Sequence, residues 1–263
     1  MIGLFLGATN FPKLIVKSLK KKNIKYFIID LTNDNKFKKD NNSHLINIGQ
    51  FGKILNLISK KKCNKVLFAG KIHKPKLSSL KLDLKGLYYI PRIIAASKLG
   101  DAAILKELIK ILAEQKIKVI KSNFFNLELT LNKDNPTILK PNKLELLQIK
   151  KGISSLNKLN AHNHVQGLIV RNNNVIAKES TKGTKKMLLS IKKLKNSKSI
   201  LIKFPKKKQD LRADLPTIGL DTLKDSKRAG IKGIVLKANQ NIFLDKKECI
   251  KFADKNEIFI IAI

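Results

Sequence analysis

The chain has 263 residues, of which 43% are hydrophobic, 55 are lysine or arginine and 19 are aspartate or glutamate, and its formal net charge is +36. This apolar content excludes wholesale disorder, and the length suits one large domain or two modest ones. Only four of the basic residues are arginine and the lysines are scattered, so the charge favours a solvated lysine surface over a dedicated nucleic-acid-binding site.

In the first half of the chain, short apolar runs alternate with helical patterns. The apolar runs predict buried strands at 2–6, 26–31, 45–48, 65–69 and 119–120. Apolar residues at helical spacing predict helices at 11–19, 51–58 and 102–115, the last with Asp101 as its N-cap. This alternation of strands and helices predicts a doubly wound, parallel sheet.

Residues 126–150 lose this alternation and contain Pro136 and Pro141, so we expect them to connect two lobes. The second half restarts with apolar runs at 168–170 and 175–177, which flank three asparagines and predict a hairpin. Further patterns predict helices at 185–194, 222–229 and 246–256 and strands at 200–203, 234–236, 242–244 and 258–261.

The expected fold is therefore α/β with two lobes. Residues 1–125 would form a Rossmann-like domain, and 126–150 a connecting segment. Residues 151–263 would form a smaller α/β catalytic domain.

Glycine turns follow two of the predicted strands. Gly3-x-x-x-Gly7 leads into a helix whose N-terminus could bind a phosphate, although an ordinary turn has the same pattern. The full dinucleotide fingerprint is missing, which leaves NAD binding unsupported. The run that ends at Gly70-Lys71 lacks the upstream glycine of a P-loop and continues with Ile72 instead of Ser or Thr, which excludes that motif.

The segment 209–216, Gln-Asp-Leu-Arg-Ala-Asp-Leu-Pro, concentrates charge in a chain that is poor in acids. If it is extended, Asp210, Arg212 and Asp214 project from the same face. Carboxylates so placed can hold a divalent cation or orient water, and the arginine can bind a phosphate oxygen. An exposed, ion-paired loop has the same composition, and the residues alone leave both interpretations open.

Glu179 follows a predicted strand and precedes Gly183-Thr184, a pattern that fits a metal or substrate position as well as a helix cap. His162 and His164 lack further ligands at zinc spacing, so we interpret them as structural or surface residues. The sequence shows no Ser/His/Asp or Cys/His pattern typical of a catalytic nucleophile, so it gives no support to covalent catalysis.

Three features bear on the location of the protein. Cys63 and Cys249 form no disulfide framework, and we expect two reduced, structural thiols. The first seven residues are too short for a secretory signal, and no apolar run reaches the roughly 20 residues that span a bilayer. We therefore expect a cytoplasmic protein whose lysines bring it to the anionic inner face of the membrane, by peripheral, salt-sensitive contact rather than insertion.

These segments together resemble, nearly from end to end, the LpxI-type UDP-2,3-diacylglucosamine pyrophosphatases of lipid A biosynthesis. The resemblance is carried by residues 7–12, 49–54, 68–71 with Pro75, 99–101, 166–167, Glu179 with 183–184 and Met187, 206–219 and 229–234. Its most specific part is the block from Gln209 to Gly219.

The resemblance implies hydrolysis of UDP-2,3-diacylglucosamine to UMP and 2,3-diacylglucosamine 1-phosphate (lipid X), assisted by Mg²⁺, with the substrate between two lobes. The essential aspartate of the family matches Asp214, and Asp210 and Arg212 are the other implied catalytic residues. The implied Mg²⁺ ligands are Asp214, Asp210, Glu179 and Asp101. The implied substrate-binding residues are Gly7, Asn10, Gly70, Lys71, Gln166, Thr184, Lys206 and Gln209.

Three positions depart from the family pattern, because Ala102, Lys185 and Asn163 stand where it usually has an acid. The alternatives are a transferase acting on another nucleotide sugar, a weakly active family member, and, from charge alone, a polyanion-binding module. We expect no specific nucleic-acid partner, and an oligomer is compatible with the sequence.

Overall fold

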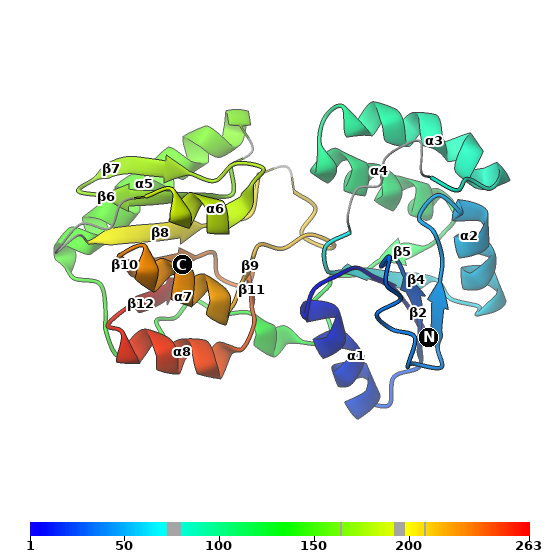
Figure 1. Ribbon diagram of the computed structural model, residues 1–263, viewed down its shortest axis with the longest axis horizontal. Helices are drawn as coiled ribbons and strands as arrows, with labels where there is room; N and C mark the ends of the chain where they lie inside the picture. The colour runs from blue at the N-terminus through cyan, green and yellow to red at the C-terminus, as the bar shows by residue number, and fades with distance from the viewer. Residues whose placement is uncertain (73–79, 164, 192–197, 208) are drawn as a thin grey trace. The chain divides into compact units, whose positions relative to one another are not determined.

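The computed structural model describes residues 1–72, 80–163, 165–191, 198–207 and 209–263. Pro75, His164, Lys208 and the end of the helix predicted at 185–194 lie outside these residues, as do the side chains of 160–163. The chain divides into two compact units (Figure 1). Unit 1 is Met1–Asn126 with Asp210–Asp214, and unit 2 is Leu127–Gln209 with Leu215–Ile263.

The described residues of unit 1 form a five-stranded parallel sheet with the order β3-β2-β1-β4-β5. Its strands are β1 (Ile2–Leu6), β2 (Tyr26–Asp30), β3 (Ser43–Leu45), β4 (Lys65–Ala69) and β5 (Lys118–Val119). The chain runs outward from β1 to β3 and then crosses to β4 on the other side of β1. The winding therefore reverses between β1 and β4, which confirms the predicted doubly wound sheet.

Helices cover both faces of this sheet. They are α1 (Phe11–Lys21), α2 (Phe51–Lys60), α3 (Leu84–Ser97) and α4 (Asp101–Glu114). Buried residues of α2, α3 and α4 share one apolar cluster with β1, β2, β4 and β5. Ile15 and Leu19 of α1 are fully buried outside that cluster, so α1 covers the opposite face.

Two features of these helices differ from the prediction. Helix α3 was not predicted, because Gly86, Pro91 and apolar residues on several sides obscure the 3.6-residue period. The N-cap of α4 is Gly100, not Asp101, since the φ of +100° at this position suits glycine, and Asp101 is the first residue of the helix.

The main sheet of unit 2 has the order β12-β10-β8-β6-β7. Its strands are β6 (Gly167–Arg171), β7 (Asn174–Lys178), β8 (Ser199–Lys203), β10 (Ile231–Leu236) and β12 (Phe259–Ala262), and a small separate pair joins β9 (Thr217–Ile218) and β11 (Ile242–Phe243). Strands β8, β10 and β12 are parallel, whereas β6 is antiparallel to both β7 and β8. The predicted hairpin is confirmed, with Asn172 and Asn173 at φ +48° and +64°, as a tight turn requires.

The helical elements of unit 2 are η2 (Leu127–Leu129), α5 (Lys143–Asn163), α6 (Gly183–Leu189), α7 (Leu220–Arg228) and α8 (Lys246–Lys255). Residues of α5 pack in a cluster on one face of the sheet, and residues of α6, α7 and α8 pack in a second cluster. In the part of the chain that is described, no helix combines the length and the apolar character needed to span a membrane.

Helix α5 begins inside the segment that was expected to be a connection. Its start is fixed by a capping box, in which Asn142 N–H donates to Glu145 Oε2 at 2.8 Å and Glu145 N–H donates to Asn142 Oδ1 at 2.9 Å. The prolines that suggested a loop therefore lie just before a helix, not in place of one.

Candidate functional site

Two glycine turns, at the carboxyl ends of β1 and β4, are hydrogen-bonded to one another through their backbones. Gly7 N–H donates to the Ala69 carbonyl at 2.9 Å, and Ala8 N–H donates to the Lys71 carbonyl at 2.8 Å. A Cβ on Gly7 would lie 2.4 Å from the Lys71 oxygen, and Gly70 has a φ of +83°. Glycine is therefore required at both positions, because the two backbones approach too closely for a side chain.

These turns lie where the winding of the sheet reverses, which is the usual ligand position in doubly wound proteins. Asn10 and Lys71, both exposed, flank the turns. Asn10 precedes α1, and within the described residues its side chain makes no capping bond to that helix. This edge thus carries an exposed amide and an exposed ammonium group, both of which can bind a phosphate oxygen.

The segment Asp210–Asp214 belongs to the same edge of unit 1. Ser122, which follows β5, donates its N–H to the Arg212 carbonyl at 2.7 Å, and Ala213 packs against the core of the unit. The carboxyl end of β5 is next to that of β4 in the sheet. The acidic motif and the glycine turns are therefore positioned by neighbouring strands.

The motif forms a turn, so the extended arrangement considered from the sequence, with three side chains on one face, does not occur. The Asp210 carbonyl accepts the N–H groups of Ala213 and Asp214 at 3.1 and 3.0 Å. The Asp210 carboxylate accepts the Arg212 N–H at 3.0 Å, an arrangement typical of an Asx turn. This local bonding bends the chain back and replaces the alternating faces of a strand.

Asp210 and Arg212 are held together by two further bonds. Arg212 Nε and Nη2 donate to the two Asp210 oxygens at 3.0 and 2.7 Å. The Arg212 guanidinium, more than the weaker field of Lys106 on α4, holds the pKa of the Asp210 carboxyl below its ordinary value of 3.8. Asp210 therefore stays ionised at neutral pH and orients Arg212.

Asp214 and Asp101 complete the predicted acids of this unit. Asp214 is half-buried next to Ala213, and Asp101 is exposed in the first turn of α4. Helix α4 leads directly into β5, so its first turn lies toward the carboxyl edge of the sheet. The sequence-predicted residues of unit 1 thus share one edge.

The predicted residues of unit 2 also gather at one edge of its sheet. Gln166 precedes β6, Glu179 follows β7, and Lys206 and Gln209 follow β8. Because β6 is antiparallel to β7 and β8, its start meets their ends, and Gly167 is paired with Lys203. Glu179 N–H donates to the Gly167 carbonyl at 2.8 Å across this edge.

Gln209 is buried and joins its neighbours through one oxygen. Its Oε1 accepts the Lys206 N–H at 2.8 Å and Gln166 Nε2 at 3.1 Å. Its Nε2, also buried, has no hydrogen-bond partner among the residues that the structure describes. A buried amide donor in this state can still take an oxygen ligand as its partner.

Glu179 and Thr184 surround a buried lysine that sequence reasoning missed. Lys203 Nζ donates to Glu179 Oε1 and Oε2 at 3.2 and 3.0 Å and to Thr184 Oγ1 at 2.7 Å, and Thr184 donates to Glu179 Oε1 at 2.9 Å. A Cβ on Gly167 would lie 2.7 Å from Glu179 Oε2, which explains the glycine there. The signal in the sequence was a lysine that ends an otherwise apolar strand.

The arrangement limits how Mg²⁺ could be held. Among the described residues, no three of the His, Cys, Asp and Glu side chains are grouped as metal ligands. An ammonium already contacts Glu179, and a guanidinium contacts Asp210. Mg²⁺ commonly takes only one or two carboxylates and completes its shell with water and substrate phosphates. The donor set fits this mode, and not an all-protein cage.

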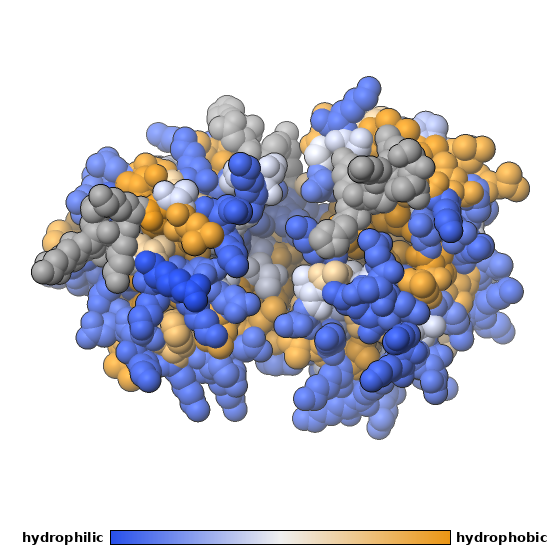
Figure 2. Space-filling model, viewed as in Figure 1, coloured by the Kyte–Doolittle hydropathy of each residue, from blue (hydrophilic) through white to orange (hydrophobic). Residues whose placement is uncertain are grey.

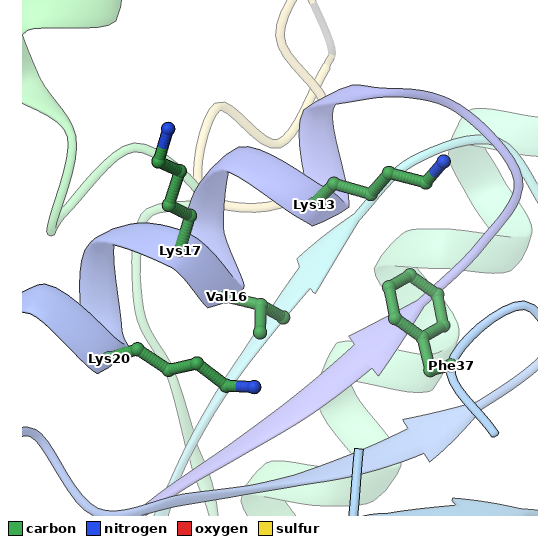
Figure 3. Close-up of a pocket in the computed structure, with 5 residues that line it drawn as sticks. All are labelled: Lys13, Val16, Lys17, Lys20 and Phe37. Carbon is green, nitrogen blue, oxygen red and sulfur yellow. The ribbon is translucent and has the colours of Figure 1, made fainter. Parts of the chain in front are cut away.

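A shallow depression of about 270 Å³ lies elsewhere on unit 1, beside α1. Figure 3 shows Lys13 and Lys20 extending to the side on which Phe37 lies, with Val16 between them and Lys17 pointing away. Lys20 Nζ is 2.8 Å from the Asp40 carboxylate. None of the sequence-predicted site residues lines this depression.

Comparison with known proteins finds matches over nearly the whole length of the chain. Residues 1–129 match the LpxI N-terminal domain, and residues 133–261 match the LpxI C-terminal domain. The chain is also similar to UDP-2,3-diacylglucosamine pyrophosphatase LpxI of Caulobacter vibrioides, with 29% identity over 226 residues. This match covers 83% of the chain and 81% of that protein.

Proposed function

Because the chain belongs to the LpxI family, we propose that it hydrolyses the pyrophosphate bond of UDP-2,3-diacylglucosamine, releasing UMP and 2,3-diacylglucosamine 1-phosphate in lipid A biosynthesis. One observation supports the proposal above the others. The Asp210–Asp214 turn is bonded to Ser122, which follows β5, at the edge of a doubly wound sheet where ligands usually bind in this class of fold.

The proposed reaction is direct attack of water on one phosphorus of the diphosphate. A bond forms between the water oxygen and phosphorus, the bond from that phosphorus to the bridging oxygen breaks, and the bridging oxygen leaves with the other phosphate. The Asp214 carboxylate either takes the proton of the water or holds the cation beside the diphosphate, in which case the proton passes to solvent. Both roles require an ionised carboxylate at this position.

The remaining residues would bind the diphosphate and hold it still. Arg212, fixed by Asp210, has further N–H groups for a phosphate oxygen. Lys71, beside the turns at Gly7 and Gly70, would contribute an ammonium group. Mg²⁺, held by Asp214 and the phosphates, would supply neutralisation of the charge that develops on the diphosphate.

The test is UMP release from the purified protein and UDP-2,3-diacylglucosamine, with no acceptor present. We expect UMP release in the presence of Mg²⁺. EDTA should abolish turnover, and added Mg²⁺ should restore it. A transferase would release no UMP under these conditions. Persistent full turnover in EDTA would contradict the role of the cation and leave the hydrolysis standing.

Asp214→Ala is expected to lower UMP release by about 10³-fold or more, because neither a general base nor a cation ligand remains. Asp34→Ala is the matched control, since Asp34 is an exposed acid of the same unit whose side chain is 64% exposed. Circular dichroism melting curves would establish that both variants fold. Turnover of the folded Asp214→Ala variant at the rate of Asp34→Ala would refute the assignment.

We further propose that the protein works in the cytoplasm, at the inner face of the membrane, because a diacylated substrate partitions into the bilayer.

A further inference from the structure

The outward side of α3 is covered by apolar residues. Leu84, Leu87 and Tyr88 are 88%, 61% and 74% exposed, and Pro91 and Ala95 are exposed as well. Residues at this spacing lie along one side of a helix. We call these five residues the α3 apolar face. Figure 2 shows hydrophobic side chains gathered on the surface over α3.

The α3 apolar face is a fixed feature, because the other side of the helix is firmly anchored. Asp83 caps α3 at Gly86 N–H and also accepts Gly52 N–H from α2, at 2.8 and 3.0 Å. Tyr89 is buried edge-on against Phe51, with ring centroids 5.4 Å apart. Arg92 binds Glu107 and Glu114 of α4 at 2.7 Å. A large apolar surface on such a rigid helix marks a binding surface.

The charges around the α3 apolar face favour an anionic bilayer over a second copy of the chain. Lys81, Lys85 and Lys98 are exposed before, within and after the helix. Two copies, each with a net charge of +36, would bring these lysines together and repel one another. Anionic headgroups attract lysines, whose aliphatic stems can lie along apolar surface, and a tyrosine such as Tyr88 suits the headgroup boundary.

We propose that the α3 apolar face docks the protein onto an anionic lipid bilayer, with Leu84, Leu87 and Tyr88 entering the acyl boundary and the lysines at the headgroups. This differs from the purely salt-sensitive contact expected from composition, because an apolar contact persists when charges are screened. The biological reason for docking rests on the proposed function, since the lipid substrate lies in the membrane.

The experiment is cosedimentation with substrate-free vesicles of phosphatidylcholine and phosphatidylglycerol, at low and high salt. The test variant is Leu84→Gln/Leu87→Gln/Tyr88→Gln, since glutamine keeps helix propensity. The matched control is Leu144→Gln/Leu147→Gln, which changes leucines of α5 that are 73% and 56% exposed. Melting curves check folding, and UMP release from substrate in detergent micelles checks the site.

We expect the test variant to partition into vesicles about tenfold less than the wild type, with the residual binding removed by salt. The control should bind like the wild type, and part of the wild-type binding should survive high salt. Equal loss in test and control, or wild-type binding that salt abolishes entirely, would overturn the proposal. The proposal would also be overturned if sedimentation velocity showed that the wild type is a dimer and the test variant a monomer, because a second copy would then cover the α3 apolar face.

Failure of this inference is separable from failure of the proposed function. Vesicle binding is measured without substrate, and turnover is measured without vesicles. A protein that binds vesicles through α3 but releases no UMP in micelles would retain the docking surface and lose the proposed reaction.

Discussion

Lys203 is buried at the end of β8, with its side chain 5% exposed, and it pairs with a Glu179 side chain that is 10% exposed. An ammonium group in the interior is tolerated only when it is paired and hydrogen-bonded. Glu179 and Thr184 supply these partners, and the Lys203 carbonyl in turn accepts Asn241 Nδ2 at 3.1 Å. The pair therefore fixes the edge of unit 2 that carries Gln166 and Gln209.

Lys203→Met is expected to lower the free energy of unfolding by about 3–5 kcal/mol, because it leaves the Glu179 carboxylate buried without its cation. Lys203→Met/Glu179→Gln should recover part of this loss. Chemical denaturation measures the free energy of unfolding of the single and the double variant. Lys232→Met is the control, since Lys232 pairs at 3.5 Å with a Glu257 side chain that is 83% exposed, and we expect less than about 1 kcal/mol there. Equal losses in the two single variants would contradict the structural role of the buried pair.

Helices α2 and α3 share one acid at their N-termini. The Asp83 carboxylate accepts N–H groups of Gly52, Lys53 and Gly86 at 3.0, 3.0 and 2.8 Å. Gly86 is needed because a Cβ there would lie 2.0 Å from the Gly49 carbonyl oxygen. Although burial opposes ionisation, these backbone donors bring the pKa of Asp83 below its ordinary value of 3.8.

Asp83→Ala is expected to lower the free energy of unfolding by about 1–2 kcal/mol at neutral pH, because both helices lose a capping acceptor. The folded pKa of Asp83 is depressed, so its contribution is complete above 3.8 and is lost as the pH falls through the folded value. In urea unfolding, the free energies of unfolding of the wild type and the variant should therefore converge only below the folded pKa of Asp83. This interpretation would be contradicted if the difference in the free energy of unfolding between the wild type and Asp83→Ala did not change at acidic pH. An equal effect of Asp34→Ala would contradict it as well.

Several elements were predictable because local chemistry determines them. Strands β1 and β4 match the predicted 2–6 and 65–69, since each is a buried apolar run closed by a glycine. Helix α5 was not predicted although its capping box is local, because the two prolines before it dominated the interpretation. Helix α3 could not be predicted from periodicity, since Tyr89 packs inward while Tyr88 faces outward.

Both units carry their candidate residues on one edge of a five-stranded sheet. The chain leaves unit 2 after Gln209 and rejoins it at Leu215, so the acids of the most specific motif belong to unit 1 and its flanks to unit 2. The motif therefore links the two units covalently twice within a few residues. Substitutions in it are expected to affect turnover more than the packing of either core, because only Ala213 contacts the core of unit 1 among its residues.

The charge of the molecule predicts weak binding to any polyanion. We expect retention on heparin and on single-stranded DNA alike, lost at modest salt and without sequence preference, because scattered lysines act through a screened field. Binding isotherms at several salt concentrations measure this. A preference for one nucleic acid sequence that persists at high salt would instead support a dedicated binding surface.

The sequence by itself determined the α/β class, most of the strands and the resemblance to the family, because these depend on local periodicity and on residue identity, whereas the short β9 was missed. Only the tertiary structure decided that the motif is a turn bonded to Ser122 after β5, that Lys203 pairs with Glu179, and that the leucines of α3 are exposed. These features depend on contacts between residues far apart in the chain, and no local pattern encodes which strand ends meet at one edge.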